Sequence, residues 1–185
     1  CRPTCPIIPG LTNRLAGRPG KRPSLRNKYP PGRMTRNMVS FLILNGPNIN
    51  MLGRRDTSLY GSKTLEEVNQ EIKWVANELG VEVIFYQSNL EGELVNCIQE
   101  HWGKIQGIVL NAGALTHYGL SLKDALIDSR LPVVEVHLSN PLAREDWRRV
   151  SVISDIARGQ IAGFGWRSYT SALKVLSEVV EEESR

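Results

Sequence analysis

The sequence contains few cysteines, and the three that it has do not form a disulfide framework. Cys1 and Cys5 lie near the start of the chain without a histidine or a further cysteine beside them, and Cys97 lies among apolar neighbours. Paired cysteines are typical of secreted domains, whereas isolated thiols are typical of a reducing compartment. We therefore expect free thiols and a cytoplasmic location.

Long apolar runs and metal-binding clusters are also absent. A membrane-spanning helix needs a run of about 18 or more apolar residues, and the sequence has none, so we expect no membrane partner. No group of His, Cys, Asp and Glu residues has the spacing of metal ligands, so the sequence implies no metal.

Acidic residues are missing from the first 40 positions, which hold nine Lys or Arg residues. The rest of the chain therefore has 14 basic and 19 acidic residues, a net charge of −5, although the whole chain carries +4. A basic chain is a signal for nucleic-acid binding. Because the excess comes entirely from the first 40 residues, we expect no nucleic-acid partner for the remainder, and a nucleic-acid role of residues 1–40 is a separate alternative.

Residues 1–39 are rich in Pro, Gly and Arg and have no apolar periodicity, which favours a disordered basic extension. They lack the continuous apolar core of a signal peptide. A transit peptide is the minor alternative, because Pro and Gly oppose an amphipathic helix. Met34 and Met38 are both plausible true starts, in which case the extension is an artefact.

From residue 40 onward, short apolar strands alternate with helical patterns. We expect strands at 41–45, 81–87, 106–112, 131–137 and 160–165, and helices at 64–80, 91–102, 120–129, 143–149 and 167–183. Thr64 and Glu67 predict a capping box at the start of one helix, and Gly80 predicts its end. This alternation indicates an α/β domain over residues 40–185, a flavodoxin-like three-layer sandwich with a five-stranded parallel sheet in the order 2-1-3-4-5.

Polar residues follow three of the expected strands. They are Asn45 to Asn48 after the first strand, Asn111 to Gly113 after the third and His137 to Asn140 after the fourth. In open α/β sheets, ligands bind beyond the carboxyl ends of the strands. We therefore expect the ligand site at this edge.

The polar segment from Gly53 to Gly61 is expected to form a lid over that edge, with the glycines as hinges. It carries Arg55 and Tyr60. A tyrosine is almost entirely protonated at neutral pH, and a neighbouring guanidinium favours the phenolate. Arg55 and Tyr60 are therefore a candidate general base, and the alternative is an exposed loop with no chemical role.

His137 ends the fourth strand, two residues after Glu135 in an otherwise apolar run. Side chains two apart on a strand point to the same side, so the carboxylate is expected to orient the imidazole and to support its protonated form. A buried histidine that is merely satisfied by Glu135 is the alternative. His117 follows the third strand, whereas His101 is expected at the surface.

Five segments resemble, in order, the motifs of the type II 3-dehydroquinate dehydratase family. They are LILNGPNINMLGRRDTSLYG (42–61), QSNLEGELVNCIQE (87–100), GIVLNAGALTHYGLSLKDAL (107–126), PVVEVHLSNPLAREDWRRVSVIS (132–154) and GQIAGFGWRSYTSAL (159–173). The resemblance covers about residues 41–180. It implies a hydro-lyase that converts 3-dehydroquinate to 3-dehydroshikimate in the shikimate or quinate pathway, by trans elimination of water through an enolate, without a cofactor.

The resemblance also implies roles for individual residues. Tyr60 matches the base, with Arg55 beside it; Asn48 matches the residue that holds a water at the enolate oxygen; His137, supported by Glu135, matches the acid. Asn111 and the backbone N–H groups of Leu138 and Ser139 match the substrate-carboxylate site, and His117 and Arg148 match contacts to the substrate hydroxyls. Asp124 matches a residue that reaches a neighbouring subunit's site, in a family whose trimers stack into dodecamers, and Arg144 matches a position at the edge of the site.

Other flavodoxin-like functions remain open on the residues alone. A flavodoxin-like flavin-binding module or electron carrier needs a Ser/Thr-rich phosphate loop after the first strand, where this chain has Asn45-Gly46-Pro47-Asn48. A phospho-acceptor domain needs a carboxylate at the end of the third strand, where this chain has Asn111. A binding module without catalytic activity is the main alternative to the dehydratase.

Overall fold

The computed structural model describes residues 38–185, so the basic extension expected at 1–39 lies almost entirely outside the described residues. The five strands are β1 (Ser40–Asn45), β2 (Glu82–Gln87), β3 (Gly107–Asn111), β4 (Val133–His137) and β5 (Gly159–Ala162). They form one parallel sheet in the order β2-β1-β3-β4-β5. This confirms the predicted fold class and strand order.

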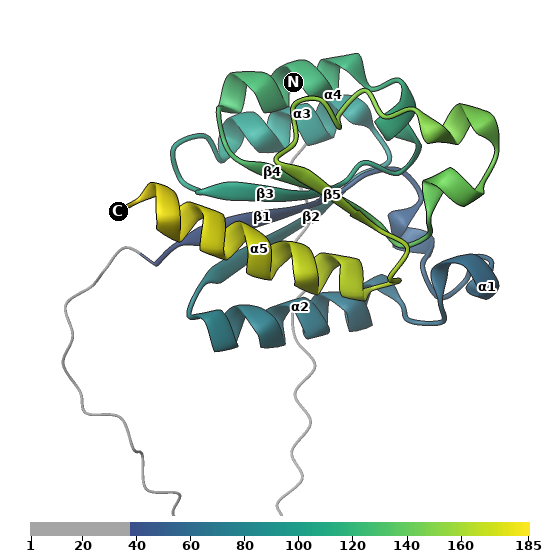
Figure 1. The fold of residues 1–185 in the computed structure, drawn as a ribbon, viewed down its shortest axis with the longest axis horizontal. Helices are drawn as coiled ribbons and strands as arrows, with labels where there is room; N and C mark the ends of the chain where they lie inside the picture. Colours follow the sequence, from purple (N-terminus) through teal and green to yellow (C-terminus); the bar gives the residue numbers. More distant parts are fainter. Residues whose placement is uncertain (1–37) are drawn as a thin grey trace, which may run out of the picture. The chain divides into compact units, whose positions relative to one another are not determined.

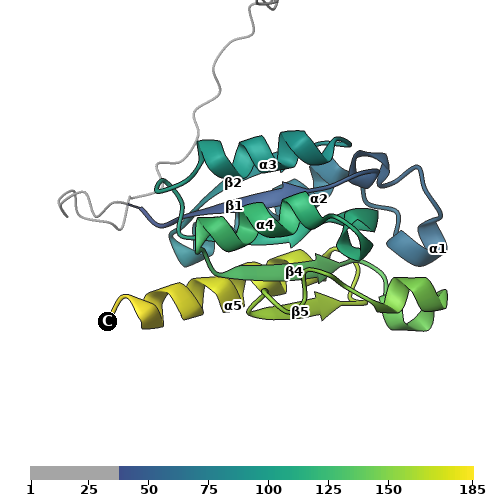
Figure 2. The same cartoon turned by 90° about the horizontal axis from the view of Figure 1, so that it is seen from above.

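Four long helices cover the two faces of the sheet (Figures 1 and 2). They are α2 (Leu65–Leu79), α3 (Glu91–Glu100), α4 (Leu120–Ser129) and α5 (Arg167–Glu183). Helices α2 and α5 pack together on one face, and α3 and α4 pack together on the other. The segments were predicted to within a few residues at each end.

The apolar residues of each strand divide between two cores. In β1, Phe41 and Ile43 pack with α2 and α5, whereas Leu42 and Leu44 pack with α3 and α4. All four side chains have no solvent exposure. Because successive side chains point to opposite faces, a strand that is covered on both faces must be apolar throughout. Cys97 is a buried thiol of the second core, and burial raises its pKa to about 11.

Helix α2 has the predicted caps at both ends. The Thr64 side chain accepts from the backbone N–H of Glu67, and the Glu67 carboxylate accepts from the backbone N–H of Thr64. Gly80 ends the helix in the left-handed conformation, with φ of 69°. These caps satisfy backbone groups that the helix leaves unpaired at its ends.

The helix predicted at 143–149 is wrong. The chain there forms two short 3-10 helices, η3 (Pro141–Ala143) and η4 (Asp146–Arg149). Arg144 lies between them in an extended conformation, and its guanidinium donates to the hydroxyl of Tyr60, 84 residues away. This long-range contact holds Arg144 out of helical geometry. The Asn140 side chain caps η3 by accepting from the backbone N–H of Leu142, so the segment does not form one continuous helix.

The expected lid segment contains one helical turn, α1 (Thr57–Tyr60). The Asp56 side chain caps this turn by accepting from the backbone N–H of Ser58 at 3.0 Å. Hydrogen bonds from the Ser58 hydroxyl and backbone hold the pKa of Asp56 below its usual range. Gly53 and Gly61 both have positive φ, at 79° and 81°, which suits the hinge positions that the sequence predicted.

The turns after β1 and β3 interlock at the carboxyl edge of the sheet. The backbone N–H of Gly46 donates to the carbonyl of Asn111 at 2.8 Å. A Cβ atom at Gly46 would lie 2.4 Å from the carbonyl oxygen of Ala112, and one at Gly113 would lie 2.8 Å from the carbonyl oxygen of Pro47. Only glycine therefore allows the two turns to approach this closely.

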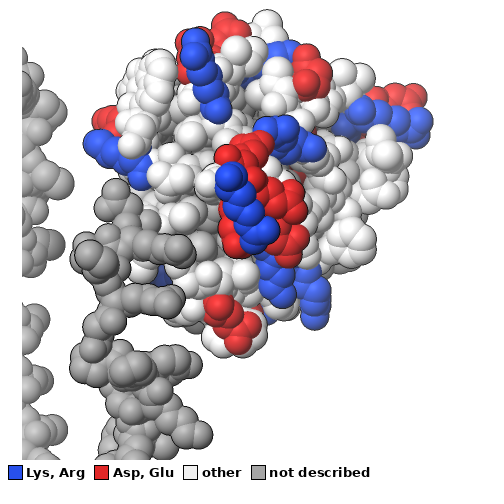
Figure 3. Space-filling view, turned by 60° about the vertical axis from the view of Figure 1, so that its left-hand side comes forward, with Lys and Arg blue, Asp and Glu red and all other residues white. Residues whose placement is uncertain are grey.

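In the part of the chain that the structure describes, no helix has both the length and the apolar character of a membrane span. On the face shown in Figure 3, acidic and basic side chains are mixed and do not separate into patches of one sign. This mixing agrees with the prediction that basic excess is confined to the first 40 residues.

We predict that Gly46→Ala lowers the free energy of unfolding by about 2 kcal/mol, because the added methyl group meets backbone atoms that cannot move aside independently. Urea unfolding measures the change. The matched control is Gly92→Ala in α3, where a Cβ atom meets nothing within 4 Å. It should be neutral or stabilising by up to about 1 kcal/mol. Equal stability of the two variants would contradict the close approach.

Candidate active site

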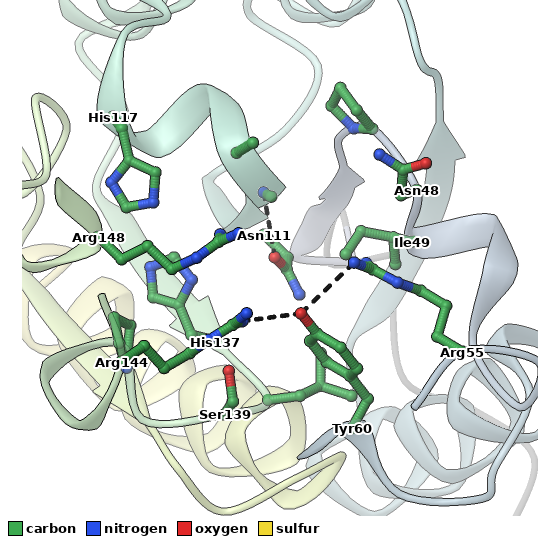
Figure 4. A pocket seen from close by; sticks show the side chains of 15 residues that line it. Asn48, Ile49, Arg55, Tyr60, Asn111, His117, His137, Ser139, Arg144 and Arg148 are labelled. Atoms are coloured by element: carbon green, nitrogen blue, oxygen red, sulfur yellow. Dashed lines mark hydrogen bonds between the residues drawn. The ribbon is translucent and has the colours of Figure 1, made fainter. Parts of the chain in front are cut away.

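A pocket of about 170 Å³ lies where the sequence predicted a ligand site, beyond the carboxyl ends of β1, β3 and β4 (Figure 4). Its walls come from the strand ends, from the segment around α1 and from η3 and η4. They are formed by Pro47, Asn48, Ile49, Arg55, Tyr60, Asn111, Gly113, Ala114, His117, His137, Leu138, Ser139, Pro141, Arg144 and Arg148. Nine of the eleven predicted site residues line it, and Glu135 and Asp124 do not.

Tyr60 presents its hydroxyl to two arginines in this pocket. Arg144 donates to the hydroxyl at 2.8 Å and Arg55 donates to it at 3.4 Å (Figure 4). The Arg55 guanidinium also lies over the tyrosine ring, 4.4 Å from its centroid. Two positive charges at this distance stabilise negative charge on the phenolic oxygen. The structure therefore brings Arg55 and Tyr60 together as predicted, and adds Arg144 at a shorter distance.

His137 lies at the pocket wall with its Nε2 3.0 Å from Glu135, which has no solvent exposure. The predicted pairing of the two side chains is confirmed. Glu135 also accepts from Thr116 at 2.5 Å, from Ser151 at 2.9 Å and from Gln160 at 2.9 Å.

These donors decide the charge of Glu135. Burial alone raises the pKa of its carboxyl, but the hydrogen bonds from His137, Thr116 and Ser151 outweigh burial and hold the pKa below the usual glutamate range. The ionised carboxylate accepts a hydrogen bond from the imidazole Nε2–H and fixes the orientation of the ring. Nδ1 is then the ring nitrogen that is available to a ligand.

His117 and Arg148 also line the pocket, on the same side as His137 in Figure 4. His117 Nδ1 lies 2.6 Å from the carbonyl oxygen of Val150, and its ring meets Trp147 edge to face at 5.1 Å. Arg148 stacks on the same indole at 4.0 Å and pairs with Glu145 at 2.9 Å. The hydrogen bond to Val150 fixes one ring nitrogen of His117, so Nε2 is the nitrogen left to contact a ligand.

Asn111, at the end of β3, is only 2% exposed but lines the pocket. Leu138 and Ser139 continue the wall directly after β4. The carbonyl of His137 accepts from Gly163 and Ser168, and that of Leu138 accepts from Gly165. These bonds tie the end of β4 to the loop that precedes α5.

Asn48 has a left-handed backbone, with φ of 67°, and its N–H donates to the side chain of Asn89 at 2.9 Å. A non-glycine residue in this conformation is uncommon and depends on the surrounding contacts. Asn89 comes from the loop after β2. It now has a structural role, because it fixes the backbone of a pocket residue.

Two predicted residues lie outside the pocket. Glu135 is behind His137, as its supporting role requires. Asp124 is exposed on α4 and is not among the lining residues. Among the described residues, no group of three or more His, Cys, Asp and Glu side chains is placed to hold a metal ion.

The sequence missed some of the residues that build the site. It gave Arg144 only an edge position, although its guanidinium is the nearer of the two at Tyr60. It did not single out Thr116, Ser151 or Gln160, which donate to Glu135 from three different segments. No local pattern marks these residues, because each contact joins positions that are 16 or more residues apart.

The pocket thus carries one side chain suited to remove a proton and another suited to donate one. His137 comes from the end of β4, and Tyr60 comes from α1 in the segment expected to form a lid. This combination defines an α/β enzyme of the acid–base type.

The chain belongs to the class II dehydroquinase family, whose model matches residues 39–177. This match covers almost the whole part of the chain that the structure describes, and it confirms the family resemblance of the sequence motifs.

Curated relatives agree with this assignment. The chain is 51% identical over 135 residues to a 3-dehydroquinate dehydratase of Herpetosiphon aurantiacus, covering 73% of this chain and 94% of the relative. It is 50% identical over 136 residues to a 3-dehydroquinate dehydratase of Prochlorococcus marinus, covering 74% of this chain and 94% of the relative.

Solved structures give the same result. The type II dehydroquinase of Butyrivibrio crossotus matches with a TM-score of 0.73 and 39% identity, over 75% of this chain and 97% of that structure. The type II dehydroquinase of Propionibacterium acnes matches with a TM-score of 0.72 and 36% identity, over 75% of this chain and 96% of that structure.

We predict that Glu135→Gln lowers the free energy of unfolding at pH 7 by about 1–3 kcal/mol, because an amide cannot accept all the bonds that the carboxylate accepts. The folded-state pKa of Glu135 is below the ordinary 4.5. The stabilisation is therefore present above the unfolded-state pKa and is lost as the pH falls through the folded-state pKa.

Urea unfolding of wild type and Glu135→Gln across this pH range tests whether the stabilisation by Glu135 is lost as the pH falls. The difference between wild type and Glu135→Gln should narrow as the pH falls below 4.5. Glu178→Gln, on the exposed side of α5, is the control and should change little at any pH. A difference that widens toward low pH would contradict an ionised Glu135.

Proposed function

We propose that this pocket is where the chain, a 3-dehydroquinate dehydratase of the class II family, eliminates water from 3-dehydroquinate to give 3-dehydroshikimate. The proposal rests chiefly on one arrangement: a tyrosine hydroxyl held by two guanidinium groups faces the same pocket as an imidazole held by a buried carboxylate. A binding module without catalytic activity needs neither of these pairs, and it is not favoured.

Tyr60, as the phenolate, is the proposed base that removes the C2 proton of the substrate. The electron pair of the C–H bond passes into an enolate, and the phenol is formed. Arg55 and Arg144 support this step because their charges stabilise the phenolate before the transfer. Asn48 is proposed to hold a water molecule against the enolate oxygen, where charge develops in the transition state.

His137 is the proposed acid. As the enolate collapses, the bond from carbon to the departing hydroxyl breaks, and the imidazolium proton makes that hydroxyl a water molecule. Glu135 favours the imidazolium and fixes its ring through Nε2. Asn111 with the N–H groups of Leu138 and Ser139 is proposed to bind the substrate carboxylate, and His117 and Arg148 are proposed to bind its hydroxyls.

We also propose that the chain works in the cytoplasm as a homo-oligomer, a dodecamer of stacked trimers. Asp124, proposed to reach a neighbouring subunit's site, is exposed on α4, as that role requires. Leu120, the first residue of the same helix, and Tyr118, two residues before it, are each 61% exposed and offer apolar area for such a contact. Sedimentation of the full chain measures the assembly, and a monomer with full activity would contradict the role of Asp124.

The direct test of function is to add 3-dehydroquinate to the purified chain and to follow the ultraviolet absorbance of the enone product. We predict that wild type forms product and that Tyr60→Phe loses about 10²–10⁴-fold in kcat, the usual contribution of a general base. Substrate binding by Tyr60→Phe, measured by calorimetry, should be largely unchanged, because only the hydroxyl is removed.

Tyr86→Phe is the matched control, since Tyr86 lies on β2 and does not line the pocket. It should retain wild-type turnover. Parallel samples with a chelator, or with borohydride added to enzyme and substrate, should also retain activity. Wild-type turnover by Tyr60→Phe would refute its role as the base.

We predict that His137→Ala separates the two proton transfers. It should retain exchange of the C2 hydrogen with deuterated solvent, while dehydration falls about 10²–10⁴-fold, because Tyr60 is intact and the acid is missing. Nuclear magnetic resonance of the substrate in deuterated water measures the exchange. His101→Ala, at the end of α3 and outside the pocket, should exchange and dehydrate normally. Loss of exchange together with dehydration would leave no support for His137 as the acid.

A further inference from the structure

Beneath the floor of the pocket, one buried tyrosine joins the ends of two strands. Tyr169, on α5, has no solvent exposure. Its hydroxyl donates to the Asn45 side-chain oxygen at 2.6 Å and accepts from the Asn111 side-chain nitrogen at 2.8 Å. Asn45 and Asn111 are the last residues of β1 and β3, and they are paired in the sheet register.

The polarity of this chain of hydrogen bonds follows from its ends. The backbone N–H of Gly113 donates to Asn111 Oδ1 at 3.2 Å, and a backbone N–H cannot accept (Figure 4). Asn111 Oδ1 must therefore face Gly113, and Nδ2 must face Tyr169. The tyrosine oxygen then accepts from Asn111, so its single proton is given to Asn45.

The burial of Tyr169 independently supports its assignment as a donor to Asn45. Removal from water raises the pKa of Tyr169, although the hydrogen bond from Asn111 acts in the opposite sense. The hydroxyl therefore keeps its proton and remains a donor to Asn45 at neutral pH.

For the pocket, the important group is the second N–H of the Asn111 amide. The Asn111 amide has two N–H bonds. One is used by Tyr169, and the plane of the amide is fixed by Tyr169 on one side and Gly113 on the other. The second N–H is held ready for a ligand at the pocket wall, and the amide cannot turn to present its oxygen instead.

We infer that Tyr169 is a positioning residue, which holds the Asn111 amide with its N–H toward the substrate carboxylate. This inference rests on the proposed function, in which Asn111 binds that carboxylate. The carboxylate does not change during the reaction, so its binding contributes equally to the ground state and the transition state. Loss of such uniform binding raises KM and leaves kcat unchanged.

The test is Tyr169→Phe, which removes the hydroxyl and keeps the buried ring. In the full chain we expect KM for 3-dehydroquinate to rise about tenfold, the effect of one hydrogen bond, with kcat near wild type. Tyr86→Phe is the matched control and should leave both constants unchanged. A Tyr169→Phe protein that melts at a lower temperature but keeps the wild-type KM would show a structural role only and would overturn the inference.

A double-mutant cycle with Asn111→Ala separates this inference from the proposed function. If Tyr169 acts through Asn111, then Tyr169→Phe should change KM little further when Asn111 is already alanine. A raised KM in Asn111→Ala with a wild-type KM in Tyr169→Phe overturns the positioning role alone. A wild-type KM in Asn111→Ala overturns the carboxylate site and the inference with it.

Asn45→Ala tests the same chain of hydrogen bonds if Tyr169→Phe does not fold. Without the Asn45 oxygen, the tyrosine proton loses its acceptor, and the hydroxyl is no longer held in line with the Asn111 amide nitrogen. KM should again rise while kcat is retained. A folded Asn45→Ala protein with both constants unchanged would contradict the inference independently.

Discussion

A carboxylate without any contact to water is stable in its ionised form only when hydrogen-bond donors replace its hydration. Glu135 is such a group, and its four donors come from four separate segments. They are Thr116 after β3, His137 on β4, Ser151 after η4 and Gln160 on β5. Each segment must be in place before the carboxylate is satisfied. The carboxylate that pairs with His137 therefore also fixes the relative positions of the strands and loops around the pocket.

The loop that carries Arg144 and Arg148 is anchored through this centre. Ser151, just after η4, binds Glu135, and the backbone N–H of Val152 donates to the carbonyl of Thr116 at 2.8 Å. His117 binds the carbonyl of Val150 in the same region. The two arginines are thus held from behind by contacts to β4 and to the 3-10 helix η2 (Gly113–His117). Because Arg144 in turn binds Tyr60, the proposed base and the proposed acid are positioned by one connected set of contacts.

Much of the fold was predictable because its signals are local. The capping box at Thr64, the end of α2 at Gly80 and the apolar strands are each read within a few residues. The spacing of Glu135 and His137 is also local, and it predicted their contact correctly. The helix predicted at 143–149 was wrong because the contact that shapes this segment is not local in the sequence. Arg144 is extended there because its partner lies 84 residues earlier, and no pattern within the segment reports that partner.

The candidate site was likewise predicted only where its signals are local in the sequence. Residue types at the strand ends predicted where the pocket lies, because parallel strands bring all their carboxyl ends to one edge. The family motifs predicted nine lining residues, including Tyr60 and Asn111. They did not predict which residues hold those side chains in place. Thr116, Ser151, Gln160 and Tyr169 are known only from the assembled structure, since each donor and acceptor pair is joined across different elements.

Two buried hydrogen-bond centres therefore lie behind the pocket, and their charges differ in a way that suits their proposed roles. The centre at Glu135 carries a negative charge and binds the neighbouring imidazole. The centre at Tyr169 consists of a protonated phenol and two neutral amides. An anionic substrate group near Asn111 meets a donor there without a nearby negative charge on the same centre. If the two centres were exchanged, a carboxylate behind Asn111 would repel the anionic substrate group. A neutral amide behind His137 would not stabilise the charged imidazolium that the proposed acid requires. The separation of one charged and one neutral centre thus suits the proposed binding of an anion and the proposed protonation of a leaving group in the same small pocket.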